Sequence, residues 1–196
     1  MEALMCHRLL LRRTKIFIFV FLAASLGELA AQSNRPFVPR EFKVPDKLET
    51  DRFRLRMLTV NDIVKDYDAV MTSVEHLQGV FGPSSSWPSA GLTLEQDLID
   101  LGWHQKEFQH RSSFAYTVMN LPESQCLGCI YIFPTTKEGY DAEVTLWVRK
   151  SEYAKGLDSV LFGAVKKWLS ERWPFKNPGY PGREIKWEKW DSLPEK

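Results

Sequence analysis

A strand, a loop with a glycine and an amphipathic helix follow one another in TLWVRKSEYAKGLDSVLFGAVKKWLSERW, residues 145–173. This order is typical of segments that bind a phosphate-bearing cofactor, because the loop exposes backbone N–H groups and the helix N-terminus adds the positive end of its dipole. Gly156 stands one residue before the helix. The segment is therefore a candidate phosphate site, although a strand, a turn and a helix also follow one another in many proteins without one.

Cys126 and Cys129, in QCLGCIYIF, have the C-x-x-C spacing of redox pairs and of half a zinc site. The motif leads into an apolar run that predicts a strand, in which residues i and i+3 point to opposite faces. No second C-x-x-C or histidine pair completes a set of zinc ligands. We therefore expect two core cysteines that are not bonded to each other, and we expect no metal site.

The composition is that of a globular protein: 196 residues, of which 44% are hydrophobic and 26% are charged. This length is enough for one ordinary domain with appendages. The formal net charge of +1 gives no sign of a nucleic-acid partner. The oligomeric state cannot be read from the sequence.

The N-terminus has the pattern of a targeting segment. Basic residues up to Lys15 precede an apolar run over residues 16–26, and the small residues Ala30 and Ala31 follow. This pattern predicts a signal peptide or membrane-targeting segment over residues 1–31, because the run is shorter than the about 20 residues of a spanning helix. We expect export or membrane contact through this segment alone. A cytoplasmic domain is the alternative, if the segment is uncleaved or the start is misassigned.

Residues 32–47 are rich in proline and polar residues and predict an extended lead-in, so the folded domain is expected over residues 48–196. Apolar and basic residues alternate over 51–58, which predicts a strand. A helix is predicted after Thr59, with an apolar stripe that includes Val60, Ile63, Val64, Tyr67, Val70, Met71 and Val74.

A second helix is predicted from Thr93, which forms a capping box with Gln96. Its buried side is marked by Leu94, Leu98, Leu101 and Phe108. Three strands then follow without a helix between them, over residues 113–119, 127–133 and 142–148, which favours antiparallel pairing. After the helix that begins at Leu157, one short strand is predicted near residues 183–187, parallel to its neighbour.

This order resembles the GNAT acyl-CoA N-acetyltransferases, in particular the branch that acetylates ribosomal proteins and amines. The segments that carry the resemblance are DRFRLRMLTVNDIVKDYDAV, LGCIYIFP and EVTLWVRKSEYAKGLDSVLFGAVKKWL, and the resemblance covers roughly residues 48–173. The resemblance implies an α/β (α+β) fold with a mixed, mostly antiparallel central sheet flanked by helices. The chain ends about where the family's last helix and final two strands would begin, so a C-terminally truncated form of the fold is expected.

The resemblance also implies acetyl-CoA as co-substrate and a small-molecule or peptide amine as acceptor. In the family, a backbone N–H of the fourth strand polarises the thioester carbonyl, and the following loop and helix bind the pyrophosphate. The matching cofactor-binding residues are Leu146, Trp147, Val148, Lys155, Gly156, Leu157, Asp158 and Ser159.

The loop differs from the family pattern Q/R-x-x-G-x-G/A at two positions. Tyr153 stands where Gln or Arg is expected, and Asp158 stands where Gly or Ala is expected. A carboxylate near the pyrophosphate repels it. Two interpretations of Asp158 stay open: Lys150 and Lys155 offset its charge, or its side chain caps the helix.

Acetyl transfer to an amine requires a base for the amine and an acid for the departing thiolate. Glu143, on the strand before the loop, is the candidate base, and Tyr180 is the candidate acid. Alternative bases are His104, Glu107 and His110 on the second helix. The sequence thus predicts an acetyl-CoA-dependent N-acetyltransferase. The alternative is a catalytically weakened CoA-binding or interaction module with the same fold.

Overall fold

The computed structural model describes residues 36–196, in which six strands form one sheet in sequence order. All neighbouring strands are antiparallel except the last two, which are parallel. This confirms the predicted mixed, mostly antiparallel sheet. The strands are β1 (Lys47–Glu49), β2 (Arg54–Met57), β3 (Phe114–Met119), β4 (Cys126–Phe133), β5 (Ala142–Val148) and β6 (Pro178–Gly179).

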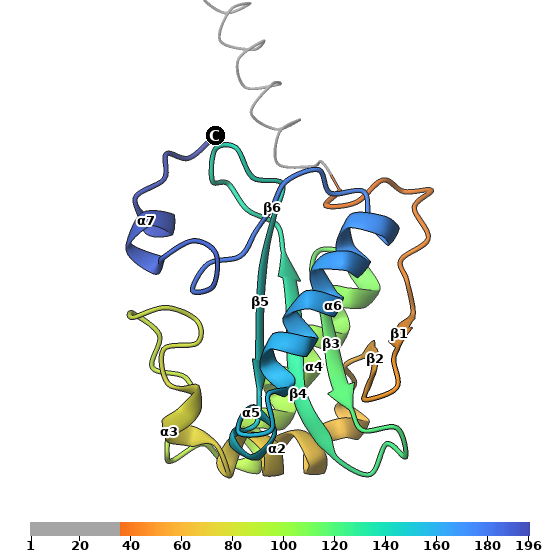
Figure 1. Cartoon of the computed structure of the whole chain (residues 1–196), viewed down its shortest axis with the longest axis vertical. Coiled ribbons are helices and arrows are strands. Elements are labelled where there is room, and N and C mark those ends of the chain that lie inside the picture. Colours follow the sequence, from red (N-terminus) through yellow and green to blue (C-terminus); the bar gives the residue numbers. More distant parts are fainter. Residues whose placement is uncertain (1–35) are drawn as a thin grey trace, which may run out of the picture. The chain divides into compact units, whose positions relative to one another are not determined.

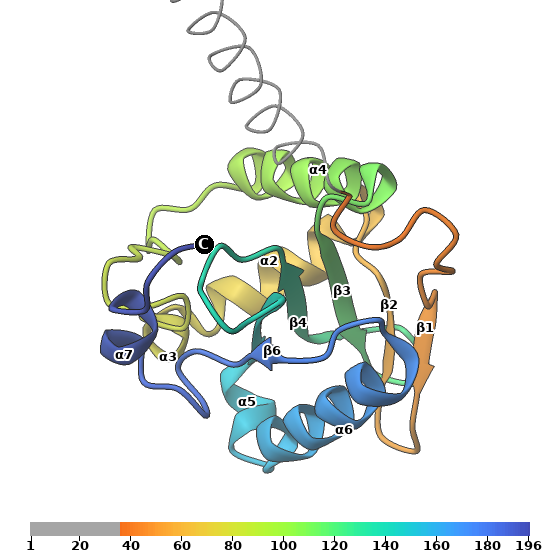
Figure 2. The ribbon, with the colours of Figure 1, turned by 90° about the horizontal axis from the view of Figure 1, so that it is seen from above.

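Helices cover both faces of this sheet. Figure 2 shows α6 on one face and α2 and α4 on the other, and Figure 1 shows the short helices α3 and α7 on the β5 side. No helix in residues 36–196 is both long and apolar enough to cross a membrane. The helical elements are η1 (Val60–Asp62, a 3-10 helix), α2 (Ile63–Met71), α3 (Val74–Leu77), α4 (Leu94–His110), α5 (Lys150–Tyr153), α6 (Leu157–Arg172) and α7 (Trp187–Asp191).

Strand β5 separates two hydrophobic cores. Alternate residues such as Val144 and Leu146 pack with Leu161 and the rest of the buried face of α6. Trp147 points to the other face and packs with Leu101 under α2 and α4. This is the alternation that the sequence predicted for residues 142–148, and it gives every second side chain of β5 to each face.

The buried faces of α2 and α4 differ from the prediction. On α2, Val64 is 70% exposed, whereas Asp66 is buried. On α4, Leu94 and Leu98 are exposed, whereas Asp97 is buried. On α2 the chain enters through a 3-10 turn, which advances by about 120° per residue instead of about 100° and so shifts the phase of the stripe. In both helices a carboxylate takes the place expected for an apolar residue.

A β-bulge in β4 changes the orientation of the two cysteines. Val118 of β3 pairs with Gly128, but the next residue, Met119, pairs with Cys126, so Leu127 is an extra residue in β4. The bulge brings Cys126 and Cys129 to the same face, in the core under α2 and α4. The predicted orientation toward opposite faces is therefore wrong.

Close approach of two backbones explains why β4 has glycine beside this bulge. A Cβ atom at Gly128 would lie 2.0 Å from the carbonyl oxygen of Trp147 in β5. No side chain fits at that distance, so the bulge and the glycine occur together. Both cysteines are free thiols.

The last strand lies earlier than predicted. Strand β6 is Pro178–Gly179, whereas residues 183–187 contain an isolated bridge of Ile185 to Pro181 and the first residue of α7, Trp187. The placement near residues 183–187 is therefore wrong, although the parallel pairing is confirmed. Gly179 allows the close packing here, because a Cβ atom would lie 2.4 Å from the ring of Trp190.

The second half of the proline-rich lead-in packs on the domain. Val38 is completely buried, and the ring of Phe37 lies 5.8 Å from the ring of Phe114 in a stacked arrangement. The lead-in is therefore part of the fold from Phe37 onward. The predicted targeting segment, residues 1–31, lies outside the described residues.

Candidate functional site

The outer edge of β5 is paired for only part of its length. β6 pairs with Ala142 and Glu143, and the described chain places no strand beside residues 144–148 on that side. The N–H of Arg149 donates to the carbonyl oxygen of Leu127 in β4, at 2.8 Å. Because the N–H and C=O of one strand residue point to the same side and the side alternates, those of Leu146 and Val148 point to the open edge.

A cavity of about 410 Å³ lies along this open edge, and we call it the β5 cleft. Its floor is residues 145–148 of β5. Its walls are the end of α3 and the loop after it, Tyr153 of α5, Asp158 of α6, and the segment from Pro181 to Trp187. The cleft therefore presents two backbone N–H groups that no strand of residues 36–196 pairs at its floor, and the start of a helix at its rim.

Asp158 is held by a residue that the sequence analysis did not single out. Arg183 donates two hydrogen bonds to the Asp158 carboxylate, at 2.9 and 2.7 Å. It donates a third to the carbonyl oxygen of Leu146, at 3.2 Å, which confirms that this residue faces the open edge. Asp158 does not cap α6, because the N-cap residue is Gly156, whose φ of 73° is left-handed. One of the two interpretations of Asp158 is therefore wrong.

The loop between β5 and α6 is a closed helical turn. The N–H groups of residues 152–156 all donate to carbonyl oxygens of residues 149–153. The N–H donors that remain are those of the first turn of α6, which have no partner within the helix. The helix dipole adds a partial positive charge at this place. An anion would therefore bind at the start of α6 more readily than inside the turn.

A second cavity, of about 430 Å³, lies on the face of β5 that α2 and α4 cover, and we call it the acidic pocket. Its size is within the usual range of ligand sites, about 300–1,000 Å³. Four carboxylates from α2, α4 and β5 line it together with one histidine and several aromatic side chains. The lining residues are Asp66, Asp97, Asp100, His104, Glu143, Phe81, Trp87, Tyr131, Phe133, Leu101 and Ser85.

Burial changes the protonation of these groups. It raises the pKa of Asp66 to about 6, and it raises the pKa of Asp97 to about 7 with help from the charges of Asp66 and Asp100. Burial also raises the pKa of Glu143, although Trp190 donates a hydrogen bond to that carboxylate at 3.3 Å. The pKa of His104 is lowered by burial. The pocket thus holds carboxylates that can exchange protons near neutral pH.

The two cavities approach each other along β5. Glu143 lines the acidic pocket and Thr145 lines the β5 cleft, and both side chains point to the same face because they are two residues apart. The hydroxyl oxygen of Thr145 is buried and has no hydrogen-bond partner in residues 36–196. The ring of Trp87 in the acidic pocket lies 5.9 Å from that of Trp147 in the cleft. Glu143 and Thr145 therefore mark the junction of the two cavities.

Solved structures with a similar fold identify this architecture. One is the ribosomal-protein-S5-alanine acetyltransferase from Vibrio fischeri, with a TM-score of 0.50 and 18% identity over 63% of this chain and 66% of that chain, just under two thirds of its length. Another is RimL, the ribosomal L7/L12 alpha-N-protein acetyltransferase in complex with coenzyme A, with a TM-score of 0.52 and 16% identity over 66% of this chain and 68% of that chain. A third is the microcin C7 self-immunity acetyltransferase MccE in complex with acetyl-CoA and AMP, with a TM-score of 0.50 and 11% identity over 66% of this chain and 71% of that chain.

The fold is that of the GNAT acetyltransferases. The expected fold class and the expected resemblance to the ribosomal-protein branch are thereby confirmed at the level of the fold. No protein-family model and no curated protein matches the sequence. The role of each residue in this GNAT-fold chain must therefore be argued from its own geometry.

Of the residues expected to bind a cofactor in this GNAT fold, half line the β5 cleft: Leu146, Trp147, Val148 and Asp158. The other four do not line it. Leu157 is buried in the core, and Lys155 forms an exposed ion pair with Glu152 at 2.7 Å. Gly156 and Ser159 lie at the start of α6, where the hydroxyl of Ser159 donates to the carbonyl oxygen of Gly156 at 3.2 Å.

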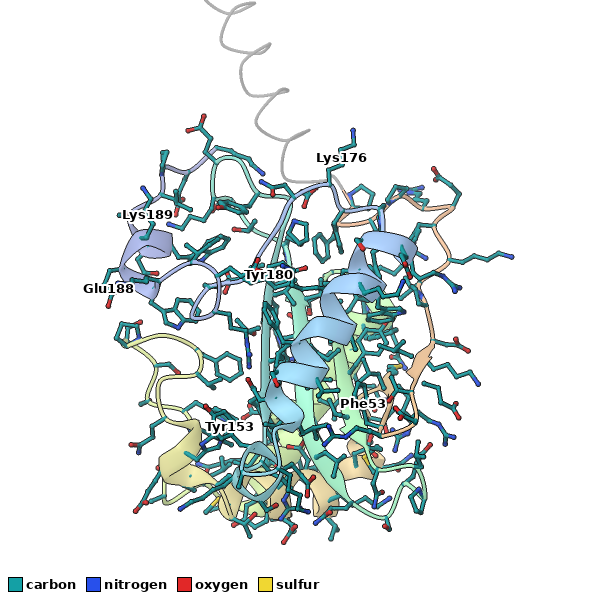
Figure 3. The ribbon with its side chains drawn as sticks, viewed as in Figure 1. Phe53, Tyr153, Lys176, Tyr180, Glu188 and Lys189 are labelled. Atoms are coloured by element: carbon teal, nitrogen blue, oxygen red, sulfur yellow. The ribbon has the colours of Figure 1, made fainter. Side chains whose placement is uncertain are left out.

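The two expected catalytic residues are not brought together. Glu143 lines the acidic pocket, whereas Tyr180 lines neither cavity and packs its ring 5.4 Å from that of Phe162. Burial raises the pKa of Tyr180 to about 12. Figure 3 shows Tyr180 beside α6, whereas Tyr153 lies near the C-terminal end of β5.

The alternative bases on α4 are separated in the same way. His104 lines the acidic pocket. Glu107 instead accepts hydrogen bonds from Ser113 and Trp103, at 2.5 and 2.8 Å. His110 is the last residue of α4 and lines neither cavity. Of the three alternatives, the fold brings only His104 to a cavity beside Glu143.

Sequence reasoning missed several residues that line the two cavities of the GNAT fold. Arg183 gave no signal, because its partner Asp158 is 25 residues away in the chain. Asp66 and Asp97 gave a weak one, since each lies next to the apolar stripe of its helix. Thr145 was the clearest omission, because a hydroxyl within the apolar run of β5 needs a partner when it is buried.

Proposed function

We propose that the chain is an acetyl-CoA-dependent N-acetyltransferase that binds acetyl-CoA in the β5 cleft and an amine in the acidic pocket. The observation that carries the proposal is the junction of the two cavities, where Glu143 and Thr145 are neighbours on one face of β5. An acyl group bound along the open edge and an amine bound beside Glu143 would meet there. Proximity of this kind supplies a large part of the rate of an acyl transfer.

The open edge of β5 suits the pantetheine arm of acetyl-CoA, which carries amide groups. An extended chain with amides can pair with a free strand edge as an additional strand would. The N–H groups of Leu146 and Val148 then serve as donors for its carbonyl groups and for the thioester oxygen. A fixed backbone N–H that donates to the oxygen where negative charge develops lowers the barrier of the reaction.

Glu143 is the base in this proposal. Its pKa is raised by burial, so it accepts a proton from an ammonium group more readily than an exposed carboxylate would. The neutral amine then attacks the thioester carbon, a C–N bond forms, and the C–S bond breaks. The thiolate of CoA leaves and takes up the proton that the nitrogen loses as the amide forms. The buried hydroxyl of Thr145 lies at the junction and has no hydrogen-bond partner in residues 36–196.

The diphosphate of CoA would bind at the start of α6. The first-turn N–H groups point outward there, and Arg183 already neutralises Asp158. Lys155 lies in the same turn with its side chain mostly exposed. Asp158 is therefore compatible with a bound anion as long as its partner arginine stays in place.

Calorimetric titration with acetyl-CoA tests the first half of the proposal, and release of free CoA thiol over a panel of amines tests the second. We expect saturable binding, and turnover that falls at least about a hundredfold in Glu143→Gln, as loss of a general base does. Glu95→Gln is the matched control, since Glu95 is exposed on α4 and lines neither cavity. No binding of acetyl-CoA would refute the assignment of the cleft.

A second function is favoured by the closed loop between β5 and α6, whose N–H groups are already bonded. It is a CoA-binding or interaction module with weak catalysis or none. Saturable CoA binding without turnover of any amine would identify this module. Turnover with the expected loss in Glu143→Gln would exclude it.

Targeting by residues 1–31 is also part of the proposal, and it bears on the substrate because acetyl-CoA is a cytoplasmic compound. Export, an uncleaved anchor and a misassigned start lead to different N-termini. Mass spectrometry of the native protein separates them, since a cleaved chain begins near residue 32 and an anchored one retains its first residues.

A further inference from the structure

The acidic pocket has two distinct acidic ends. Asp66 comes from α2, and Asp97 and Asp100 come from α4, which contacts α2; the charges of Asp66 and Asp100 act on Asp97. The pKa of Glu143 is affected instead by the charges of Asp191, the last residue of α7, and Lys137, in the loop between β4 and β5. The carboxylates of α2 and α4 therefore form one end, and Glu143 forms the other.

The end formed by α2 and α4 contains a buried carboxylate without a partner. Asp97 is 3% exposed, and no donor in residues 36–196 reaches its Oδ2 atom. Asp66 is 4% exposed and accepts side-chain hydrogen bonds from the thiols of Cys129 and Cys126, at 3.3 and 3.8 Å. Thiols are weak donors. These carboxylates are therefore poorly compensated by the protein itself.

No lysine or arginine of residues 36–196 lines this pocket. Two buried carboxylates in one pocket without a cation are costly, because both burial and mutual repulsion oppose their charge. A positively charged ligand removes both costs. The same reasoning does not apply to an anion or to a neutral ligand, which would leave the carboxylates uncompensated.

The space between the two ends is lined by aromatic rings. Tyr131 and Phe133 stack with their ring planes 4° apart, and the ring of Phe81 meets that of Tyr131 edge-on at 5.4 Å. The ring of Trp87 lies 5.0 Å from that of Phe81. Such walls suit an apolar chain, and they also attract a cation over a ring face.

We propose that the acceptor is a compact diamine, whose distal ammonium group is bound by Asp66 and Asp97 and whose reacting nitrogen lies at Glu143. This assignment rests on the proposed function and names the substrate class of the same site. The apolar spacer of the diamine lies along the aromatic wall. A cavity of about 430 Å³ accommodates a molecule of this size.

Binding without acetyl-CoA tests the pocket alone. The probes are 1,5-diaminopentane and 1-aminopentane, which have the same length and differ by one ammonium group. We expect the diamine to bind at least about tenfold more tightly, as loss of one partner of a buried charge pair implies. Equal affinities for the two amines would overturn the proposal.

Asp97→Asn removes the charge with almost no change of shape. It should bring the ratio of the two affinities close to one, whereas Glu95→Gln, which removes a charge from the exposed side of α4, should leave the ratio as in the unchanged protein. An unchanged ratio in Asp97→Asn would overturn the assignment of the distal end. If that variant fails to fold, the shift of the melting temperature of the unchanged protein with each amine gives the same comparison.

Turnover separates this proposal from the proposed function. If the protein acetylates 1-aminopentane as efficiently as 1,5-diaminopentane, it is an N-acetyltransferase and the diamine assignment is wrong. If it binds the diamine selectively and transfers no acetyl group, the pocket is a diamine site and the proposed catalytic function is wrong. Selective binding together with selective acetylation supports both.

Discussion

Arg183 and Asp158 form an ion pair with two parallel hydrogen bonds, of 2.9 and 2.7 Å, at the rim of the β5 cleft. The pair connects the segment after β6 to the first turn of α6. It also neutralises the acidic residue that occupies the position of a small residue in the GNAT loop pattern. The paired geometry is specific to arginine, because a lysine cannot offer two donors in one plane.

Arg183→Ala should weaken CoA binding by about tenfold or more, because an unpaired Asp158 then faces the diphosphate. In Arg183→Ala with Asp158→Asn, most of the affinity should return, since the repulsive charge is gone. Calorimetric titration with CoA measures both effects. Lys176→Ala is the control, because Lys176 is exposed and lines neither cavity. Unaltered affinity in Arg183→Ala would show that the diphosphate binds elsewhere.

Gly156→Val should abolish CoA binding and leave the domain folded. Gly156 has a φ of 73°, and a valine there costs about 1–2 kcal/mol or shifts the first turn of α6. Open space surrounds the position, so a steric clash is not the cause. CoA titration and thermal unfolding measure the two effects.

Gly163→Val is the matched control for this prediction. Gly163 also has open space around it, but it lies inside α6 and its φ is not left-handed. If Gly156→Val binds CoA as well as the unchanged protein does, the assignment of this loop to the diphosphate is wrong.

The free protein should lose stability as the pH rises from about 4 to about 7. The pKa of Asp97 is raised to about 7 in the folded state, so in this window the folded state binds more protons than the unfolded state. Stability falls with pH wherever the folded state binds more protons. Asp66, with a pKa of about 6, acts in the same direction.

Asp97→Asn should flatten this pH dependence, since an amide does not titrate. One pKa unit of the shift corresponds to about 1.4 kcal/mol, so the effect is measurable by denaturant unfolding at a series of pH values. A pH dependence of equal slope in the variant would show that Asp97 is ionised in the folded state.

Metal analysis of the purified protein should find no zinc at Cys126 and Cys129. Asp66 is the third group close to them, and no fourth ligand of the usual types joins them in residues 36–196. Burial also raises the pKa of the Cys129 thiol, which opposes the thiolate form that a metal requires. One zinc per chain that disappears in Cys126→Ser with Cys129→Ser would contradict this.

The order and type of most elements could be predicted because they depend on local patterns. The alternation over residues 142–148 gave β5 without error, and Thr93 with Gln96 marks the start of α4 through a real capping box. Patterns of this kind report which side of an element is buried whenever the element is regular.

The remaining features depend on contacts that no local pattern contains. The bulge at Leu127 reversed the side on which Cys126 lies, and the glycine beside it is required by the backbone of Trp147 in a neighbouring strand. The position of β6 was predicted wrongly because residue 179 must be glycine to make room for the ring of Trp190, and glycine has a low β propensity. Asp66 was passed over because a buried carboxylate is rare and follows no apolar rule.

The acidic pocket could not be predicted for a related reason. Its carboxylates come from α2, α4 and β5, which are far apart in the sequence and meet only in the fold. The candidate base Glu143 was found because a resemblance to a known family pointed to its strand. The roles of Asp97 and Thr145 could be recognised only once the burial of their side-chain oxygens was known.

The short outer strands of the sheet affect how the protein behaves at high concentration. β1 has three residues and carries charges at Lys47 and Glu49, and β6 has two residues and begins with Pro178, which has no N–H to donate. Both margins therefore offer little backbone for the strand of another molecule. The unpaired half of β5 exposes a longer stretch of strand edge, so a ligand in the β5 cleft would also block the pairing of this edge with another molecule.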